Sequence, residues 1–321
     1  MTRRIRSFSR PRPDVASNVV VETFQETLHG RPLTRPSPDF DDKVVGILAR
    51  ALELFPVSLH GFVLLPEGYR VLASYGDPEV MAGFQCHLST NLSKQVGRSY
   101  GWRETVFPRR YGATQLSGEP EVELERLRRL LAAPVDADWV ERPEDWPGVS
   151  CVGSFLSGEP LRGRWIDRAA YWDALSRGRQ VTLDDFTEQK EVRLVPLPSL
   201  AHLSAEEYRL LVRGLVDDIE AAARARHRKG GTVPVGLAGV AALGMERVSV
   251  KCRRRRRRRP WFFALDPELK EALRSALLLI MAQYAAAAAE LKKGNRLARF
   301  PLHTFAPTLG FVREVEILEP G

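Results

Sequence analysis

Residues 62–73 constrain the fold of this chain more than any other stretch. They read Phe-Val-Leu-Leu-Pro-Glu-Gly-Tyr-Arg-Val-Leu-Ala, which is two short apolar runs on either side of a Pro-Glu-Gly turn. Val, Leu and Phe favour strands, and a short segment that contains glycine favours a chain reversal. The stretch therefore predicts a β-hairpin in the middle of a sheet, with strands at about 57–65 and 69–74.

The segments around the hairpin predict the rest of an N-terminal domain. Residues 19–25 and 110–116 favour two further strands. Apolar residues recur every three or four positions in 41–55, 77–97 and 119–133, which indicates three helices. The order strand, helix, strand, strand, helix, strand, helix predicts an α+β protein with a ferredoxin-like βαββαβ antiparallel-sheet domain and helices on one face of the sheet.

The second half of the chain predicts a mainly helical C-terminal region. A capping box, Ser204 to Glu207, begins a helix that runs to about residue 228, and Asp266-Pro267-Glu268 begins another that runs to about residue 293. Residues 151–200 are expected to form loops and short segments with four packing anchors, namely Trp165, Tyr171, Trp172 and Phe186. The predicted segments are a basic arm (1–17), the sheet domain (18–150), a mixed then helical segment (151–231), a linker of small residues and arginines (232–260), and a C-terminal helix with a strap (261–321).

The positive charge of the chain is concentrated in one place. The net charge is +8, and seven of these charges lie in the run Arg253 to Arg259, so that the remainder carries only +1. A local basic run favours contact with a polyanion through phosphate neutralisation. The alternative is a solvated linker, because like charges at this density repel one another.

The cysteines and the apolar stretches of the sequence predict where in the cell the protein is located. The three cysteines, Cys86, Cys151 and Cys252, are far apart and lack metal-ligand spacing, which is typical of a reducing cytosol. The basic N-terminus lacks an apolar core, so no signal peptide is expected. The most apolar stretch, 275–289, is short for a bilayer span, so we expect a helix of a soluble protein. The predicted location is cytoplasmic, at the nucleoid if the protein binds DNA, with no membrane contact.

Several segments carry a resemblance to a known family. They are the strand end Thr23-Phe24-Gln25, the loop Arg35 to Pro38, His60 to Leu65 leading into Tyr69, Asn91 to Arg98, Gly101 to Arg103, Phe107 with Arg109 to Tyr111, and Asp145 to Val149. In this order and spacing, residues 19–150 resemble the single-tyrosine HUH transposases, and most closely their REP-associated tyrosine transposase branch. The resemblance covers about two-fifths of the chain.

The resemblance implies a specific chemistry. Members of the family bind single-stranded DNA beside a hairpin, and two histidines spaced H-x-H on a central strand hold Mg²⁺ or Mn²⁺. The metal polarises the scissile phosphate, and a tyrosine on the helix after the fourth strand attacks it to form a phosphotyrosine link. Members occur as monomers and as dimers, so the resemblance leaves open whether this chain forms a homodimer.

This sequence departs from the family at its reactive positions. The family's Asn-His-x-His corresponds to Glu67-Gly68-Tyr69-Arg70. Gly68 has no ligand atom, and Arg70 brings a positive charge to the place of the cation. The tyrosine position falls at or beside Arg129. We therefore expect no catalytic residue, no metal site and no cofactor; Mg²⁺ or Mn²⁺ would be needed only by an active transposase.

Substitute ligands and nucleophiles are not evident in the sequence. No two histidines lie two or four residues apart; the six are His29, His60, His87, His202, His227 and His303. Glu67 could bind a metal as a lone carboxylate or could be a solvated turn residue, and we prefer the second interpretation. Tyr69, Tyr100 and Tyr111 are candidate nucleophiles, but sheet packing or base stacking is the preferred role for all three.

The leading hypothesis is a transposase-like protein that binds hairpin or single-stranded DNA without cutting it. The predicted DNA-binding residues are Arg70, Arg109, Arg110, Tyr111, Arg129, Arg253, Arg254, Arg255, Arg256, Arg257, Arg258 and Arg259. Arg70 and Arg129 would replace a metal–phosphate contact by guanidinium–phosphate contacts, unless they reflect drift in a decaying gene. Two alternatives stay open: an active metal-dependent tyrosine transposase, and a scaffold or interaction protein without a DNA role.

Overall fold

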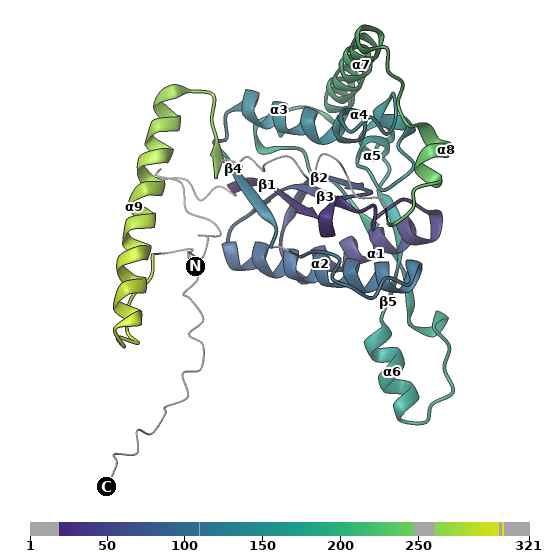
Figure 1. Ribbon diagram of the computed structural model, residues 1–321, viewed down its shortest axis with the longest axis horizontal. Coiled ribbons are helices and arrows are strands. Elements are labelled where there is room, and N and C mark those ends of the chain that lie inside the picture. The colour runs from purple at the N-terminus through teal and green to yellow at the C-terminus, as the bar shows by residue number, and fades with distance from the viewer. Residues whose placement is uncertain (1–18, 109, 247–260, 302–303, 305–321) are drawn as a thin grey trace. The chain divides into compact units, whose positions relative to one another are not determined.

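A five-stranded sheet forms the centre of the compact unit that the described residues up to Lys270 build (Figure 1). The computed structural model describes residues 19–108, 110–246, 261–301 and 304. The strands lie in the order β2 (Ser58–Leu65), β3 (Gly68–Tyr75), β1 (Val19–Glu26), β4 (Gly112–Leu116) and β7 (Phe262–Phe263). Neighbours among the first four are antiparallel, whereas β7 is parallel to β4. The predicted α+β class and the central hairpin are confirmed, and the fifth strand is an addition.

The turn of the hairpin requires a glycine at position 68. Gly68 has φ +142°, a conformation that residues with a side chain rarely adopt. A Cβ atom built there would lie 2.0 Å from the carbonyl oxygen of Gln25 on the neighbouring strand. The close pairing of β1 and β3 therefore excludes any larger residue from this position without a shift of the backbone.

Helices cover both faces of the sheet, so the prediction of helices on one face is wrong. The helices α1 (Pro38–Leu54) and α2 (Pro78–Tyr100) share one core with Val21 and Val71. The helix α3 (Pro120–Leu131) shares the opposite core with Val20 and Leu72, and Figure 1 shows α3 and α2 on opposite sides of the sheet. Because consecutive strand residues point to opposite faces and both are apolar here, both faces need a cover.

Further helices complete the core on the α3 side. The helices that contribute to it are α4 (Ala133–Asp136), α5 (Val152–Ser157), α7 (Ala205–Gly230) and α8 (Gly236–Ala241). Single turns of 3₁₀ helix occur at Leu28–Gly30, Pro143–Asp145, Asp184–Phe186 and Pro198–Leu200. The capping box predicted for α7 is confirmed, with both Ser204 and Glu207 bonded to the opposite backbone N–H.

The outer edge of β2 is paired by other parts of the chain. The Leu64 N–H donates to the Val149 carbonyl at 2.9 Å, and the Cys151 N–H donates to Phe62 at 3.0 Å. The Val195 N–H donates to the Leu59 carbonyl at 2.9 Å. These bonds satisfy backbone groups that an open edge strand would expose.

A second, two-stranded sheet projects from α1. It consists of β5 (Leu161–Ile166) and β6 (Thr187–Val192), with α6 (Arg168–Ser176) in the connection between them. Glycines allow the close approach of β5 to α1: a Cβ atom at Gly46 would lie 2.0 Å from the Arg164 carbonyl oxygen. We call residues 161–192 the arm. The sequence predicted only loops and short segments here, and the expected anchor Trp172 is 64% exposed.

The described residues divide after Lys270 into two compact units, which are considered separately. The helix α9 (Pro267–Lys292) lies almost wholly in the second unit, where the Tyr284 ring lies 5.2 Å from that of Phe300. By length and composition alone α9 could cross a membrane, a criterion that core helices of soluble proteins also meet. The expectation of a soluble helix at 275–289 therefore stays a prediction.

Candidate functional site

The face of the sheet that α3 covers buries charged side chains. Glu22 lies in the middle of β1 and is 4% exposed, and Arg70 lies on β3 with its side chain 24% exposed. Both share a face with Val20 and Leu72, because strand residues two apart point the same way and Glu22 pairs with Leu72. Arg126 reaches this face from α3 and is 5% exposed. We call Glu22, Arg70 and Arg126 the arginine–glutamate cluster.

Glu22 holds the two arginines unequally. Arg126 Nη1 donates a hydrogen bond to Glu22 Oε2 at 3.0 Å. Arg70 Nη1 lies 3.8 Å from Glu22 Oε1, which is an ion pair beyond hydrogen-bond distance. The Arg126 guanidinium also lies 3.9 Å from the ring centroid of Phe263 on β7, a cation–π contact. Arg126 is thus fixed on two sides, while Arg70 is held by charge alone.

The cluster carries more positive than negative charge. Burial lowers the pKa of Arg126; the neighbouring Glu22 opposes the shift, and the positive charge of Arg129 adds to it. Two guanidinium groups share one carboxylate, and the Arg126 Nε atom is buried without a hydrogen-bond partner among the described residues. Surplus positive charge at a place of low polarity attracts an anion.

The structure brings together only part of the predicted site. Arg70 joins the cluster, and Arg129 lies on α3 with an exposed side chain whose charge acts on Arg126. Arg110 is exposed and Tyr111 half-buried, directly before β4 begins at Gly112. Arg109 and the run Arg253 to Arg259 lie outside the described residues. The assignment of all these residues to DNA binding stays a prediction.

Sequence reasoning missed Glu22 and Arg126, which are the buried core of the cluster. Both had a signal. Glu22 interrupts an apolar strand directly after three valines, and Arg126 lies four residues from both Val122 and Leu130 on the buried stripe of α3. A charged residue at a core position of two separate elements suggests that the two residues pair.

The residues at the family's metal positions do not fit a divalent cation. Gly68 offers no ligand atom and has no room for a side chain, and Arg70 places a guanidinium against Glu22. Among the described residues, no group of three or more His, Cys, Asp and Glu side chains gathers as a metal site would require. The isolated histidine His60 is buried, and burial lowers its pKa; its Nδ1 donates to the Val195 carbonyl, and Nε2 accepts from the Ser74 hydroxyl, each at 2.9 Å.

The hydroxyls of Tyr69 and Tyr100, both candidate nucleophiles, donate hydrogen bonds within the chain. Tyr69 is 1% exposed on the α1 and α2 side, burial raises its pKa, and its hydroxyl donates to Gln85 Oε1 at 3.1 Å. The Tyr100 hydroxyl donates to the Arg35 carbonyl at 2.7 Å, and burial raises its pKa. An attacking tyrosine needs an accessible hydroxyl that loses its proton readily, and these environments oppose both conditions.

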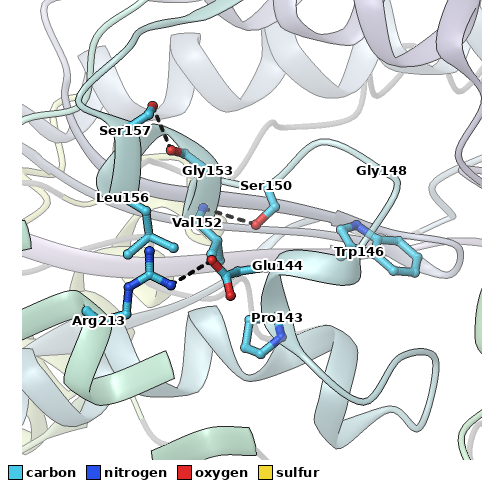
Figure 2. Close-up of a pocket in the computed structure, with 10 residues that line it drawn as sticks. All are labelled: Pro143, Glu144, Trp146, Gly148, Ser150, Val152, Gly153, Leu156, Ser157 and Arg213. Atoms are coloured by element: carbon cyan, nitrogen blue, oxygen red, sulfur yellow. Dashed lines mark hydrogen bonds and ion pairs between the residues drawn. The ribbon is translucent and has the colours of Figure 1, made fainter. Parts of the chain in front are cut away.

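A hollow of about 460 Å³ lies beside α5, near residues 143–157 (Figure 2). Two charged residues that line it form an ion pair with each other: Arg213 Nη1 donates to Glu144 Oε1 at 2.8 Å. The Ser157 hydroxyl donates to the Gly153 carbonyl at 2.9 Å, and the Trp146 indole N–H donates to Leu64 at 3.0 Å. Since these polar groups bond within the chain, we assign this hollow no ligand.

Comparison with known proteins gives a distant structural likeness. No family model matches the chain. No curated protein matches it either. One solved structure that does match is described as the REP associates tyrosine transposase bound to a REP hairpin. The two share 14% sequence identity with a TM-score of 0.35, over 47% of this chain and 86% of the other.

Proposed function

We propose that this protein binds the phosphate backbone of structured single-stranded DNA at the arginine–glutamate cluster and does not cut it. The observation that carries the proposal is the charge arrangement of the cluster, in which two arginines surround one buried carboxylate. The choice of DNA as the polyanion rests on the sequence resemblance described above. The cytoplasmic location, a homodimeric state and a contribution of the Arg253 to Arg259 run belong to the same proposal.

Arg70 has the properties of a phosphate-binding group. A guanidinium carries five N–H donors in a planar fork, and the Arg70 side chain donates no hydrogen bond to any described residue. Its partial exposure gives a ligand access, while Glu22 keeps the group on the sheet face. A phosphate oxygen that accepted these donors would also balance the surplus charge of the cluster. Arg129, exposed on α3, extends the positive surface from which the backbone would approach.

The absence of cutting follows from the residues at the reactive positions. A nicking enzyme of the resembled family needs two ligands for a cation and an accessible tyrosine. Here Gly68 and Arg70 occupy the ligand positions, and Arg129 lies at or beside the tyrosine position by the sequence alignment. Holding without cleavage is the function that this set of side chains supports.

A gel experiment tests the proposal. Labelled hairpin DNA with a single-stranded flank is mixed with the full-length protein, in Mn²⁺ or in chelator, and half of each sample is denatured. We expect a native shift of equal strength in both conditions and no shortened strand or covalent adduct. An adduct that forms only with Mn²⁺ would favour the active transposase, and no shift at low salt would favour the scaffold.

A pair of variants locates the binding. Arg70→Gln should weaken the native shift roughly tenfold, because a charge-assisted hydrogen bond to phosphate is lost. Arg50→Gln is the matched control: Arg50 belongs to α1 and pairs with the neighbouring Glu53 at 2.9 Å. Equal binding by both variants would remove the cluster from the interface.

A further inference from the structure

The arm carries an aromatic side chain in an unusual position. Trp172 lies on α6, and 64% of its surface is exposed. Figure 1 shows α6 at the far end of the arm, away from the five-stranded sheet and from α3. A tryptophan is on average a highly buried residue, so an indole held in solvent at the end of a projection needs an explanation.

The indole is supported by neighbouring rings. The Tyr171 ring lies 5.2 Å from that of Trp172 at an angle of 62°, and 6.0 Å from that of Phe186 at 68°. The helix beneath them is capped, because the Asp167 carboxylate accepts a hydrogen bond from the Ala170 N–H at 3.0 Å. Trp172 therefore joins a small aromatic cluster through an edge contact, and most of its ring stays open to solvent, where a planar group can stack.

The acidic residues at the end of the arm are engaged within the chain. Asp167 caps α6, and Asp173 pairs with Arg177 at 3.1 Å. Asp185 accepts hydrogen bonds from the N–H and the hydroxyl of Thr182 at 2.7 and 3.1 Å. Asp184 belongs to the group of carboxylates that raise the pKa of Arg164. Three of these carboxylates thus accept hydrogen bonds or form an ion pair within the arm, and Asp184 lies within electrostatic range of Arg164.

Two arginines of the arm remain without such partners. Arg168 and Arg179 form no ion pair with any residue that the structure describes, although both belong to a region rich in carboxylates. Arg168 lies four residues before Trp172, so the two share one face of α6. Burial, together with the positive charge of Arg168, lowers the pKa of Arg98 at the end of α2, so the two guanidinium groups lie within electrostatic range of each other.

An exposed aromatic ring beside unpaired arginines fits single-stranded nucleic acid. Every base offers a flat face for stacking, and the backbone supplies phosphates for the cations. An apolar protein partner fits less well, because exposed polar residues surround the indole, among them Asp173, Ser176 and Arg177. A duplex fits less well too, because its base faces are already stacked.

We propose that the arm is a second contact for single-stranded nucleic acid, in which Trp172 stacks on an unpaired base and Arg168 binds a neighbouring phosphate. The inference rests on the proposed function for the class of ligand, but it uses no residue of the arginine–glutamate cluster. The two regions would bind different parts of one DNA molecule. The sheet face would bind the backbone of the hairpin, and the arm would bind the single-stranded flank.

The test measures binding of the full-length protein to three labelled twelve-nucleotide ligands by fluorescence anisotropy. They are oligodeoxythymidylate, an oligonucleotide of equal length in which every base is missing, and the duplex of the first with its complement. We expect Trp172→Ala to weaken binding of oligodeoxythymidylate about tenfold and to leave binding of the abasic strand and the duplex unchanged. Trp172→Phe should keep most of the affinity, because a phenyl ring still stacks.

Charge variants complete the test. Arg168→Gln should weaken the binding of both single-stranded ligands. It should also reduce the magnitude of the slope of log affinity against log salt concentration by about one. Arg177→Gln is the matched control, because its charge is already paired with Asp173 on the same arm. If Trp172→Ala binds oligodeoxythymidylate as tightly as the unchanged protein, the inference is overturned.

The outcomes separate the arm from the sheet face. Loss of binding in Trp172→Ala with no effect of Arg70→Gln would support the arm and overturn the cluster as the binding site. The reverse result would overturn the inference and leave the proposed function standing. Failure of the unchanged protein to bind any of the three ligands at low salt would overturn both.

Discussion

The two faces of the central sheet solve the problem of buried polar groups in opposite ways, and the neighbours Tyr69 and Arg70 show the difference. Tyr69 points toward α1 and α2, where its hydroxyl donates to Gln85, whose amide donates to Thr23 at 2.7 Å. Arg70 points to the other face and meets Glu22. The first network is neutral and bonded within itself, whereas the second is charged and has one cation more than it has anions.

The difference indicates what each face can do. A neutral network that satisfies its own donors and acceptors stabilises the fold and offers nothing to a ligand. A charged cluster costs desolvation energy and gains from an added counterion. Two consecutive residues of β3 therefore belong to different environments: Tyr69 to a structural network and Arg70 to a candidate binding site.

The largest effect that would test this contrast comes from Glu22. Glu22→Gln should destabilise the protein by roughly 3–5 kcal/mol, because it leaves the buried Arg126 charge without its carboxylate. Chemical denaturation followed by circular dichroism measures the change. Glu53→Gln is the control: Glu53 is half-exposed and pairs with Lys190 at 2.8 Å, and a surface pair of this kind contributes less than about 1 kcal/mol.

A second variant tests whether the loss of stability in Glu22→Gln comes from the unpaired charge of Arg126. Arg126→Met in the Glu22→Gln background removes the uncompensated charge and should recover most of the lost stability. If Glu22→Gln costs no more than Glu53→Gln, then the charges of this face are not held in the interior, and the contrast between the faces fails.

An intermediate effect concerns pH and Asp41, in the first turn of α1. Burial raises the pKa of this carboxyl from 3.8 to about 7. Between these values the folded state binds more protons than the unfolded state, so its contribution to stability is present at low pH and is lost as pH rises toward and through 7. The stability of Asp41→Asn relative to the unchanged protein should rise by about 3 kcal/mol between pH 5 and pH 8.

His60, which bonds to Ser74 on the charged face, should show the opposite sign. Burial lowers its pKa, so the unfolded state binds the proton more strongly, and this contribution is lost as pH falls below about 6.5. Denaturation midpoints from pH 5 to pH 8 distinguish the two residues when Asp41→Asn and His60→Asn are compared. Slopes of the same sign would show that burial is not what sets these pKa values.

The smallest effect tests the neutral network. Tyr69→Phe removes one hydrogen bond and leaves the Gln85 carbonyl oxygen without its donor, which should cost about 1 kcal/mol. A double-mutant cycle with Gln85→Met isolates the pair, since removal of both partners should cost less than the sum of the two single changes. Additive effects would mean that the network is not coupled. DNA binding should be unchanged in Tyr69→Phe, in contrast to Arg70→Gln.

The sequence by itself determined the local elements of this protein. Strand-favouring runs predicted β1 to β4, the helical spacing of apolar residues predicted α1 to α3, and helix-start signals predicted α7 and α9, because these patterns depend on neighbours within one or two turns of chain. It also determined the departure from the resembled family, since the side chain at position 68 or 70 follows from the printed residue. Gly68 illustrates the limit, because its identity predicted a turn but not the contact with Gln25 that excludes every larger residue.

Only the tertiary structure decided which distant residues meet. Glu22 and Arg126 are 104 positions apart, and Phe263 reaches Arg126 through a strand that pairs with β4 from far along the chain. The side of the sheet that α3 covers and the exposure of Trp172 on the arm are decided in the same way. Local propensity contains no information on these contacts, because their energy comes from burial and charge pairing that exist only after the chain has folded.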